Sequence, residues 1–220
     1  MASLNQTQPL SVQPPVPHPN RGRRIRLLAV IAAMLIFVAV VVFALSNSNP
    51  FAAVTTVSPE AGFARDMIVH HNQAVELAIL LYDRTQNAEL RQIALDIILS
   101  QQNQIGQMQG WLYLWGLPTT GTDLPMAWMN APIQQGLMPG MATDEQIAAL
   151  RDATGTDADR LFLQLMIPHH ESAIHMAQYI EERTNVAAVK NLAHSMIESQ
   201  AGEIQILQSI LDQLGTGQTQ

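Results

Sequence analysis

The chain has 220 residues, of which 48% are hydrophobic and 13% charged, a balance typical of a globular protein rather than a disordered one. It contains no cysteine, which excludes disulfides and also excludes thiolates as nucleophiles or metal ligands. The net charge of −7 argues against nucleic acid as a partner.

The first 45 residues differ from the rest of the chain. Residues 1–24 are rich in Pro, Gln and Asn, which predicts a disordered cytoplasmic tail. Residues 25–45 predict one transmembrane helix, because nineteen consecutive residues from Leu27 to Leu45 carry no charge and can cross a hydrocarbon layer of about 30 Å. Four arginines between residues 21 and 26 predict that the N-terminus lies in the cytoplasm and the remaining chain outside the cytoplasmic membrane.

A cleaved secretory signal is the alternative interpretation of this segment. Ala44-Leu45-Ser46 would serve as the cleavage site, and the product would be a secreted protein. The apolar run is longer than the roughly 7 to 15 residues usual for signals, which favours a retained anchor. In both cases the chain after residue 46 is exported, and it carries all 18 acidic residues and 7 of the 11 basic ones, a net charge of −11.

The exported part predicts an all-α domain. A linker over residues 46–57 leads to a helical hairpin over 58–115, a crossover over 116–156, a second hairpin over 157–214 and a tail over 215–220. In the first hairpin, helices run from Ser58-Pro59 to about Arg84 and from Asn87 to before Gly116; in the second, they run from Thr156 to about Arg183 and from Val186 to Gly215. Thr143 and Gln146 form a capping box for a short helix within the crossover.

The two hairpins are copies of one unit. The segment from Met67 to Ala74 returns at an offset of ninety-nine residues as Met166 to Ala173, and the same offset relates Phe63 to Phe162 without an insertion. A single hairpin cannot bury its apolar stripe alone, so the pair predicts a ferritin-like antiparallel four-helix bundle with pseudo-twofold symmetry. A bundle formed by hairpins from two chains, and hence a homo-oligomer, is the alternative.

A Met/His cluster occurs once in each repeat. At 100° per residue, Met166, His169, His170 and Met176 share one helix face, and Met67, His70 and His71 lie at the equivalent angles. Thioether sulfur and imidazole nitrogen suit soft and borderline metals, and the spacing allows one helix to offer two ligands. The predicted metal ligands are Met67, His70, His71, Met166, His169, His170 and Met176.

The alternative for these residues is ordinary packing, with methionines as core filler and the histidines hydrogen-bonded inside the core. Gln101 and Gln200 occupy equivalent positions on apolar stripes. They would either hold the non-ligating nitrogen of a histidine or reach water at the edge of the stripe. His175 lies opposite the cluster and is expected to face solvent, and Pro168 is expected to kink its helix beside His169.

The crossover is rich in methionine. It carries Met126, Met129, Met138 and Met141, which are weaker candidates as metal ligands. Thioethers in an exported loop suit Cu(I), and an apolar loop packed over one end of the bundle is the equal alternative.

Four pieces of the sequence together have a recognisable order. They are Phe63 with Met67-Ile68-Val69-His70-His71, Ala74 and Ala78; Trp111-Leu112 with Trp115-Gly116; Met138-Pro139-Gly140-Met141; and Phe162 with Met166-Ile167-Pro168-His169-His170, Ala173 and Met176-Ala177. These pieces resemble one family, the domain-of-unknown-function family numbered 305, which includes the CopM-like copper-binding proteins. The resemblance covers nearly all of residues 58–214. It implies a ferritin-like four-helix fold in an exported protein and, for CopM-like members, copper binding through Met and His linked to copper tolerance.

The function expected from the sequence is therefore a membrane-anchored, extracytoplasmic protein that sequesters or delivers copper, Cu(I) in preference to Cu(II), without catalytic turnover. One alternative is a structural or interaction module that binds no metal. A metal-dependent redox enzyme is the weaker alternative, because di-iron bundles use carboxylates on all four helices and Glu-x-x-His motifs, and the chain has no such motif.

Overall fold

The computed structural model describes residues 21–47, 54–134 and 137–216. The predicted tail up to residue 20, residues 48–53 of the predicted linker and residues 217–220 therefore lie outside the described part. The chain divides into two units, with the boundary after Asn49. The described residues form helices and connecting segments, with no strand among them.

The first unit contains one helix, α1 (Arg21–Asn47). Its segment Ile25–Val42 has a mean hydropathy of 3.0, and every residue of that segment is exposed within the structure. The helix is long and apolar enough to cross a membrane, and a signal sequence near an N-terminus would have the same properties.

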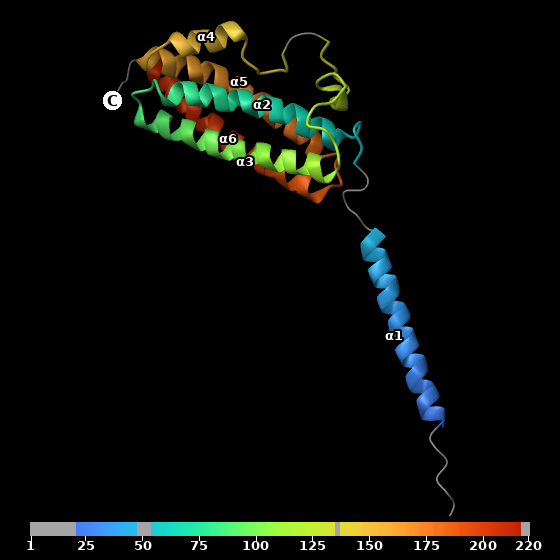
Figure 1. Cartoon of the computed structure of the whole chain (residues 1–220). Helices are drawn as coiled ribbons and strands as arrows, with labels where there is room; N and C mark the ends of the chain where they lie inside the picture. Colours follow the sequence, from blue (N-terminus) through green and yellow to red (C-terminus); the bar gives the residue numbers. More distant parts are fainter. Residues whose placement is uncertain (1–20, 48–53, 135–136, 217–220) are drawn as a thin grey trace, which may run out of the picture. The chain divides into compact units, whose positions relative to one another are not determined.

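The second unit is a four-helix bundle, as the duplicated hairpins predicted. The first repeat forms one antiparallel hairpin and the second repeat forms the other, and the two hairpins meet mainly where α2 packs on α5. Figure 1 shows the four long helices side by side, with the crossover and its short helix passing over them. The elements are α2 (Pro59–Tyr82), α3 (Ala88–Leu114), the 3₁₀ turn η1 (Ala127–Met129), α4 (Asp144–Asp152), α5 (Gly155–Glu181) and α6 (Ala187–Gly215).

Local sequence signals account for most helix ends. Asn87 caps α3, with its side-chain oxygen accepting from the amides of Glu89 and Leu90. The capping box of Thr143 and Gln146 at the start of α4 is confirmed. At α2, Ser58 occupies the N-cap position ahead of Pro59, but its hydroxyl bonds the amide of Thr55 rather than a helical amide.

Two buried apolar clusters fill the bundle, one on each side of a polar layer. One cluster takes the N-terminal half of α2 and the C-terminal half of α5, while the other takes their opposite halves, as antiparallel helices require. Between the clusters each of the four long helices contributes two polar side chains. This polar layer consists of His70 and His71 on α2, Gln101 and Gln104 on α3, His169 and His170 on α5, and Gln200 and Glu203 on α6.

A hydrogen bond joins the two repeats at the turn of the second hairpin. The hydroxyl of Thr184, in that turn, donates to the carboxylate of Glu60 in the first turn of α2 at 2.8 Å. The counterparts of these residues at the ninety-nine-residue offset, Thr85 and Asp159, are both buried. Burial raises the pKa of Asp159. The hydroxyl of Thr85 donates within its own turn, to the carbonyl of Asn87 at 3.5 Å, so the two turns are buried alike but bonded differently.

The crossover is fixed to the bundle beside the polar layer. Gln73 of α2 bonds both backbone groups of Ala142, with its amide nitrogen donating at 2.9 Å and its oxygen accepting at 2.7 Å. Gly140 has a φ of +77°, and a Cβ atom there would come within 2.4 Å of the carbonyl oxygen of Pro168. Pro168 itself lies inside α5, which remains one continuous helix from Gly155 to Glu181. The crossover can lie this close to α5 because residue 140 has no side chain.

We expect Gly140→Ala to destabilise the domain by more than about 1–2 kcal/mol, because the left-handed backbone conformation and the contact with α5 both exclude a methyl group. Gly106→Ala is the matched control, since Gly106 occupies an exposed position in α3 and a Cβ there meets nothing within 4 Å. It should stabilise the helix by about 0.5–1 kcal/mol. Urea unfolding of both variants measures the difference, and equal stabilities would contradict this account of the crossover.

A candidate metal centre in the middle of the bundle

The four histidines of the repeated motifs meet inside the bundle. His70 and His71 come from α2, His169 and His170 come from α5, and each is at most 1% exposed. The rings of His70 and His169 lie 3.8 Å apart between centroids, tilted by 39°. Because these two residues are equivalent in the repeat, their contact places them at the pseudo-twofold axis. The rings of His169 and His170 are 6.4 Å apart.

Oxygen atoms hold three of the four rings. Nε2 of His70 lies 3.3 Å from the carbonyl oxygen of Pro139 in the crossover. Nε2 of His71 lies 2.7 Å from the side-chain oxygen of Gln104 on α3, and Nε2 of His170 lies 2.6 Å from a carboxylate oxygen of Glu203 on α6. A neutral imidazole that donates from Nε2 carries its lone pair on Nδ1. These three bonds therefore assign the proton to Nε2 and leave Nδ1 as an electron-pair donor.

The Nδ1 atoms have no partner. Nδ1 of His70, His71 and His170 is buried without a hydrogen bond, and neither ring nitrogen of His169 has one. Metal-bound histidines commonly have one nitrogen on the metal while the other donates to a carboxylate, a carbonyl or an amide oxygen. His70, His71 and His170 have the bond to oxygen that this arrangement requires, and their free Nδ1 atoms could bind a metal.

Burial keeps three of these imidazoles, those of His70, His71 and His169, uncharged. Burial lowers the pKa of His70 to about 4 and that of His71 to about 3, with nearby histidines adding to the effect. Burial also lowers the pKa of His169 well below its ordinary value, as do His70, His170 and His71. At neutral pH these three rings are therefore neutral, and no proton competes with a metal ion for their lone pairs.

The partners of His71 and His170 are residues that we did not predict. For Gln101 and Gln200 the two predicted alternatives were a hydrogen bond to a histidine nitrogen and contact with water at the edge of the stripe. Both side chains are buried, and neither bonds a histidine. The bonds come from Gln104 and Glu203, one helical turn further along. The repeat contained a signal for them, because Gln104 and Glu203 are themselves ninety-nine residues apart and each lies thirty-three residues after its histidine. One half of the layer thus has an amide where the other has a carboxylate.

The predicted methionine ligands do not all lie on one side of the histidines. Met67 and Met176 are fully buried in one apolar cluster, and Met166 is fully buried in the other. The crossover methionines accompany Met67 and Met176. Met126, Met129 and Met138 are buried in that same cluster, and Met141 packs against it.

No group of three His, Asp or Glu side chains within the described residues is placed to hold a metal ion. The closest pair of imidazoles is that of His70 and His169. A metal centre in the layer would therefore need thioether ligands or a rotation of the imidazoles in addition to this pair. His175 is exposed, as predicted, and His194 is exposed with its Nδ1 2.9 Å from Glu181, so both lie outside the centre.

The bundle with its paired His-His motifs belongs to a recognised class of helical domains. Residues 60–211 match the family described as Domain of unknown function (DUF305), and the chain is therefore a member of that family. A DUF305 protein from Streptomyces coelicolor is 45% identical, with a TM-score of 0.70 over 73% of this chain and 96% of that one. A DUF305 fragment from Deinococcus radiodurans is 34% identical, with a TM-score of 0.60 over 70% of this chain and 96% of that one.

CopM is a further structural relative, solved in Cu(II)-bound and Cu(I)-bound forms. The Cu(II)-bound form is 27% identical, with a TM-score of 0.58 over 70% of this chain and 96% of that one. Uncharacterized protein L153 of Acanthamoeba polyphaga mimivirus is 46% identical over 55 residues, which are 25% of this chain and 36% of that protein. The chain thus matches only about a third of that relative's length.

The lowered pKa values predict that the metal-free domain loses stability on acidification. A histidine whose pKa is lower in the folded state binds fewer protons there than in the unfolded state, so stability is retained above the unfolded value of 6.5 and lost as the pH falls toward 4 and then 3. Between pH 7 and pH 5 we expect a loss of up to about 2 kcal/mol for each of His70, His71 and His169.

Urea unfolding at pH 7 and pH 5 tests this expectation on the wild type and on His71→Leu/Gln104→Leu, which removes both partners of one bond together. The variant should lose less stability between the two pH values than the wild type. A control with His175→Asn and His194→Asn, both exposed, should behave as the wild type. An equal loss in the wild type and the Leu variant would show that His71 is not held neutral.

Proposed function

We propose that the protein is an extracytoplasmic copper-binding protein, held at the cytoplasmic membrane by α1, that sequesters or delivers copper through its histidine layer. The observation that carries this proposal is the set of four buried imidazoles whose Nδ1 atoms have no partner, three of which are bonded to oxygen through Nε2. A buried nitrogen without a partner destabilises a fold, and a bound metal ion would satisfy it.

The choice of copper rests on the ligand types. Imidazole suits copper and zinc alike, whereas thioethers favour Cu(I), and Met67 and Met166 precede the two His-His pairs by one helical turn. The family relative CopM has been solved with copper bound, which supports the same choice. We propose His70, His71, His169 and His170 as ligands, with Met67, Met166 and Met176 completing the coordination and the crossover methionines Met126, Met129, Met138 and Met141 contributing more weakly.

The membrane attachment is proposed from α1 and the arginines that precede its apolar segment. If the segment were cleaved, the same domain would be secreted. Mass spectrometry of the protein from a membrane fraction separates the two cases, because retention of α1 leaves peptides from residues before Ala44 in the mature chain. An N-terminus at Asn47 in the mature protein would contradict the anchor and leave the copper proposal unaffected.

The copper proposal is tested by competitive titration of the full-length protein in detergent with Cu(I) under a calibrated chelator, and in parallel with Zn(II). In His70→Phe/His169→Phe a flat ring remains at both stacked positions, but the ligand nitrogens are lost. We expect the Kd for Cu(I) to rise more than about 100-fold, since even residues that only orient a ligand account for about 10- to 100-fold. His175→Asn/His194→Asn removes the same number of histidines from the surface and should leave the Kd unchanged.

Replacing all four buried histidines should abolish binding at this layer. Unchanged binding in both histidine variants would place any copper elsewhere in the molecule. If the wild type bound no Cu(I) above the chelator background while the variants lost stability, the layer would be a structural feature, and the domain a structural or interaction module.

A further inference from the structure

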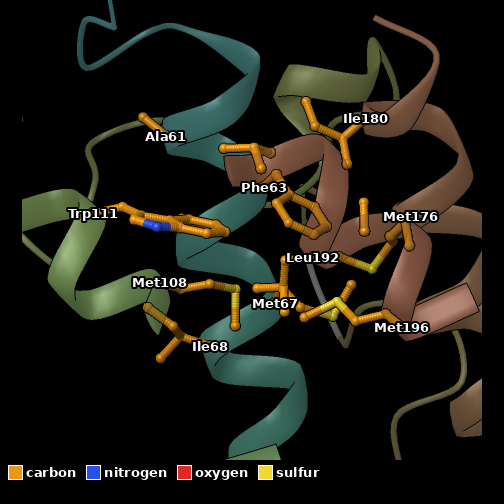
Figure 2. Packing of buried hydrophobic residues seen from close by; sticks show 14 of the residues in the cluster. Ala61, Phe63, Met67, Ile68, Met108, Trp111, Met176, Ile180, Leu192 and Met196 are labelled. Carbon is orange, nitrogen blue, oxygen red and sulfur yellow. The ribbon is translucent and has the colours of Figure 1, made fainter. Parts of the chain in front are cut away.

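Methionines are distributed unequally between the two apolar clusters of the bundle. Seven buried methionines lie in the cluster that receives the N-terminal half of α2, whereas the other cluster contains Met166. Figure 2 shows four of the seven, Met67, Met108, Met176 and Met196, gathered in the same part of the core near Phe63 and Leu192. Each of the four long helices contributes one of these four side chains, and all four are fully buried.

The internal repeat supplies a control for what this part of the fold requires. At the ninety-nine-residue offset, the counterparts of the four methionines lie in the other cluster, and all of them are also fully buried. Only one counterpart is a methionine. Met67 corresponds to Met166, Met108 to Leu207, Met176 to Leu77 and Met196 to Ile97.

Packing alone does not explain this difference. Methionine is an adaptable filler of irregular cores, but the equivalent positions are filled by branched aliphatic side chains in the same backbone arrangement. Three of the four positions differ, and every difference places a thioether in the same cluster. The shared property is therefore the sulfur atom rather than the volume.

Four buried thioethers favour one kind of metal ion. Thioether sulfur is a soft, neutral donor that prefers Cu(I) among first-row metals, and Ag(I) shares that chemistry. A hard or divalent ion would lose its hydration without gaining a compensating anion from these side chains. The same cluster contains Met126, Met129 and Met138 of the crossover, which are 5–9% exposed, whereas the other four methionines are fully buried.

We propose that Met67, Met108, Met176 and Met196 form a second metal site, beside the histidine layer, that holds one soft monovalent cation, Cu(I) or Ag(I). When both sites are filled, Met67 and Met176 bind the cation of the methionine site, and the histidine layer keeps its four imidazoles and Met166 as ligands. This site goes beyond the histidine-based function, because it needs no imidazole and excludes Zn(II) and Cu(II).

The test uses Ag(I), which needs no reductant, on the full-length protein in detergent. Met108→Leu/Met196→Ile gives these two positions the residue types of their repeat counterparts and leaves all the ligands proposed for the histidine layer in place. We expect this variant to bind one Ag(I) fewer than the wild type, or to bind it at least about 100-fold more weakly, because two ligands are lost. Its Zn(II) titration should be unchanged.

The matched control is Ile97→Leu/Leu207→Ile, which alters packing at the equivalent positions without changing the number of sulfurs. It should bind Ag(I) as the wild type does. His70→Phe/His169→Phe should retain the Ag(I) of the methionine site even if the histidine layer loses its metal, so the two proposals fail independently. Unchanged Ag(I) stoichiometry and affinity in Met108→Leu/Met196→Ile would overturn the methionine site.

A second measurement uses the wild type alone and does not depend on the folding of a variant. In protein labelled with ¹³C at the methionine methyl groups, Ag(I) should shift the signals of Met67, Met108, Met176 and Met196, with single Met→Leu substitutions providing the assignments. The signal of Met34 in α1 should not move. If Ag(I) left the four core signals in place, the proposal would be wrong.

Discussion

The structure depends on the burial of a polar layer between two apolar clusters. Four imidazoles and two glutamines lie inside the bundle at 3% exposure or less, where a polar group without a hydrogen bond costs about 1–3 kcal/mol. Five of the eight ring nitrogens of these imidazoles have no hydrogen-bond partner. The apolar clusters on both sides must offset this cost, and the helix contacts that bury the layer also bring His70 and His169 together.

The duplicated repeats form the scaffold, and the differences between them make its two halves chemically unlike. The repeats supply equivalent helices, equivalent histidines and buried threonines at equivalent turns, Thr85 and Thr184. The repeats differ at the equivalent positions 104 and 203, where the amide of Gln104 bonds His71 and the carboxylate of Glu203 bonds His170. A carboxylate polarises the imidazole that it holds more strongly than an amide does, so the two His-His pairs offer electron pairs of unequal basicity.

The sequence predicted the helices, their order and the four-helix bundle, because caps, glycines and a 3.6-residue apolar period are local signals. It also predicted the burial of the His-His motifs and the exposure of His175. It did not show which of Gln101 and Gln104 bonds a histidine, since residues one turn apart share a helix face and differ only in their position along the helix axis. An angular projection also gives no position along the helix axis, and in the structure Met67 and Met166 lie in different apolar clusters, on opposite sides of the histidines.

The contact of the crossover with His70 and α5 has a kinetic consequence. Pro139 bonds His70, Gly140 lies against the backbone of α5, and the four imidazoles are at most 1% exposed. We expect an ion that enters or leaves the histidine layer to require a local opening, in which this segment of the crossover moves away from the bundle. The residence time of a bound ion would then be governed by the free energy of that local opening. Of two such proteins with equal Kd, the one whose crossover opens more easily would have the higher dissociation rate.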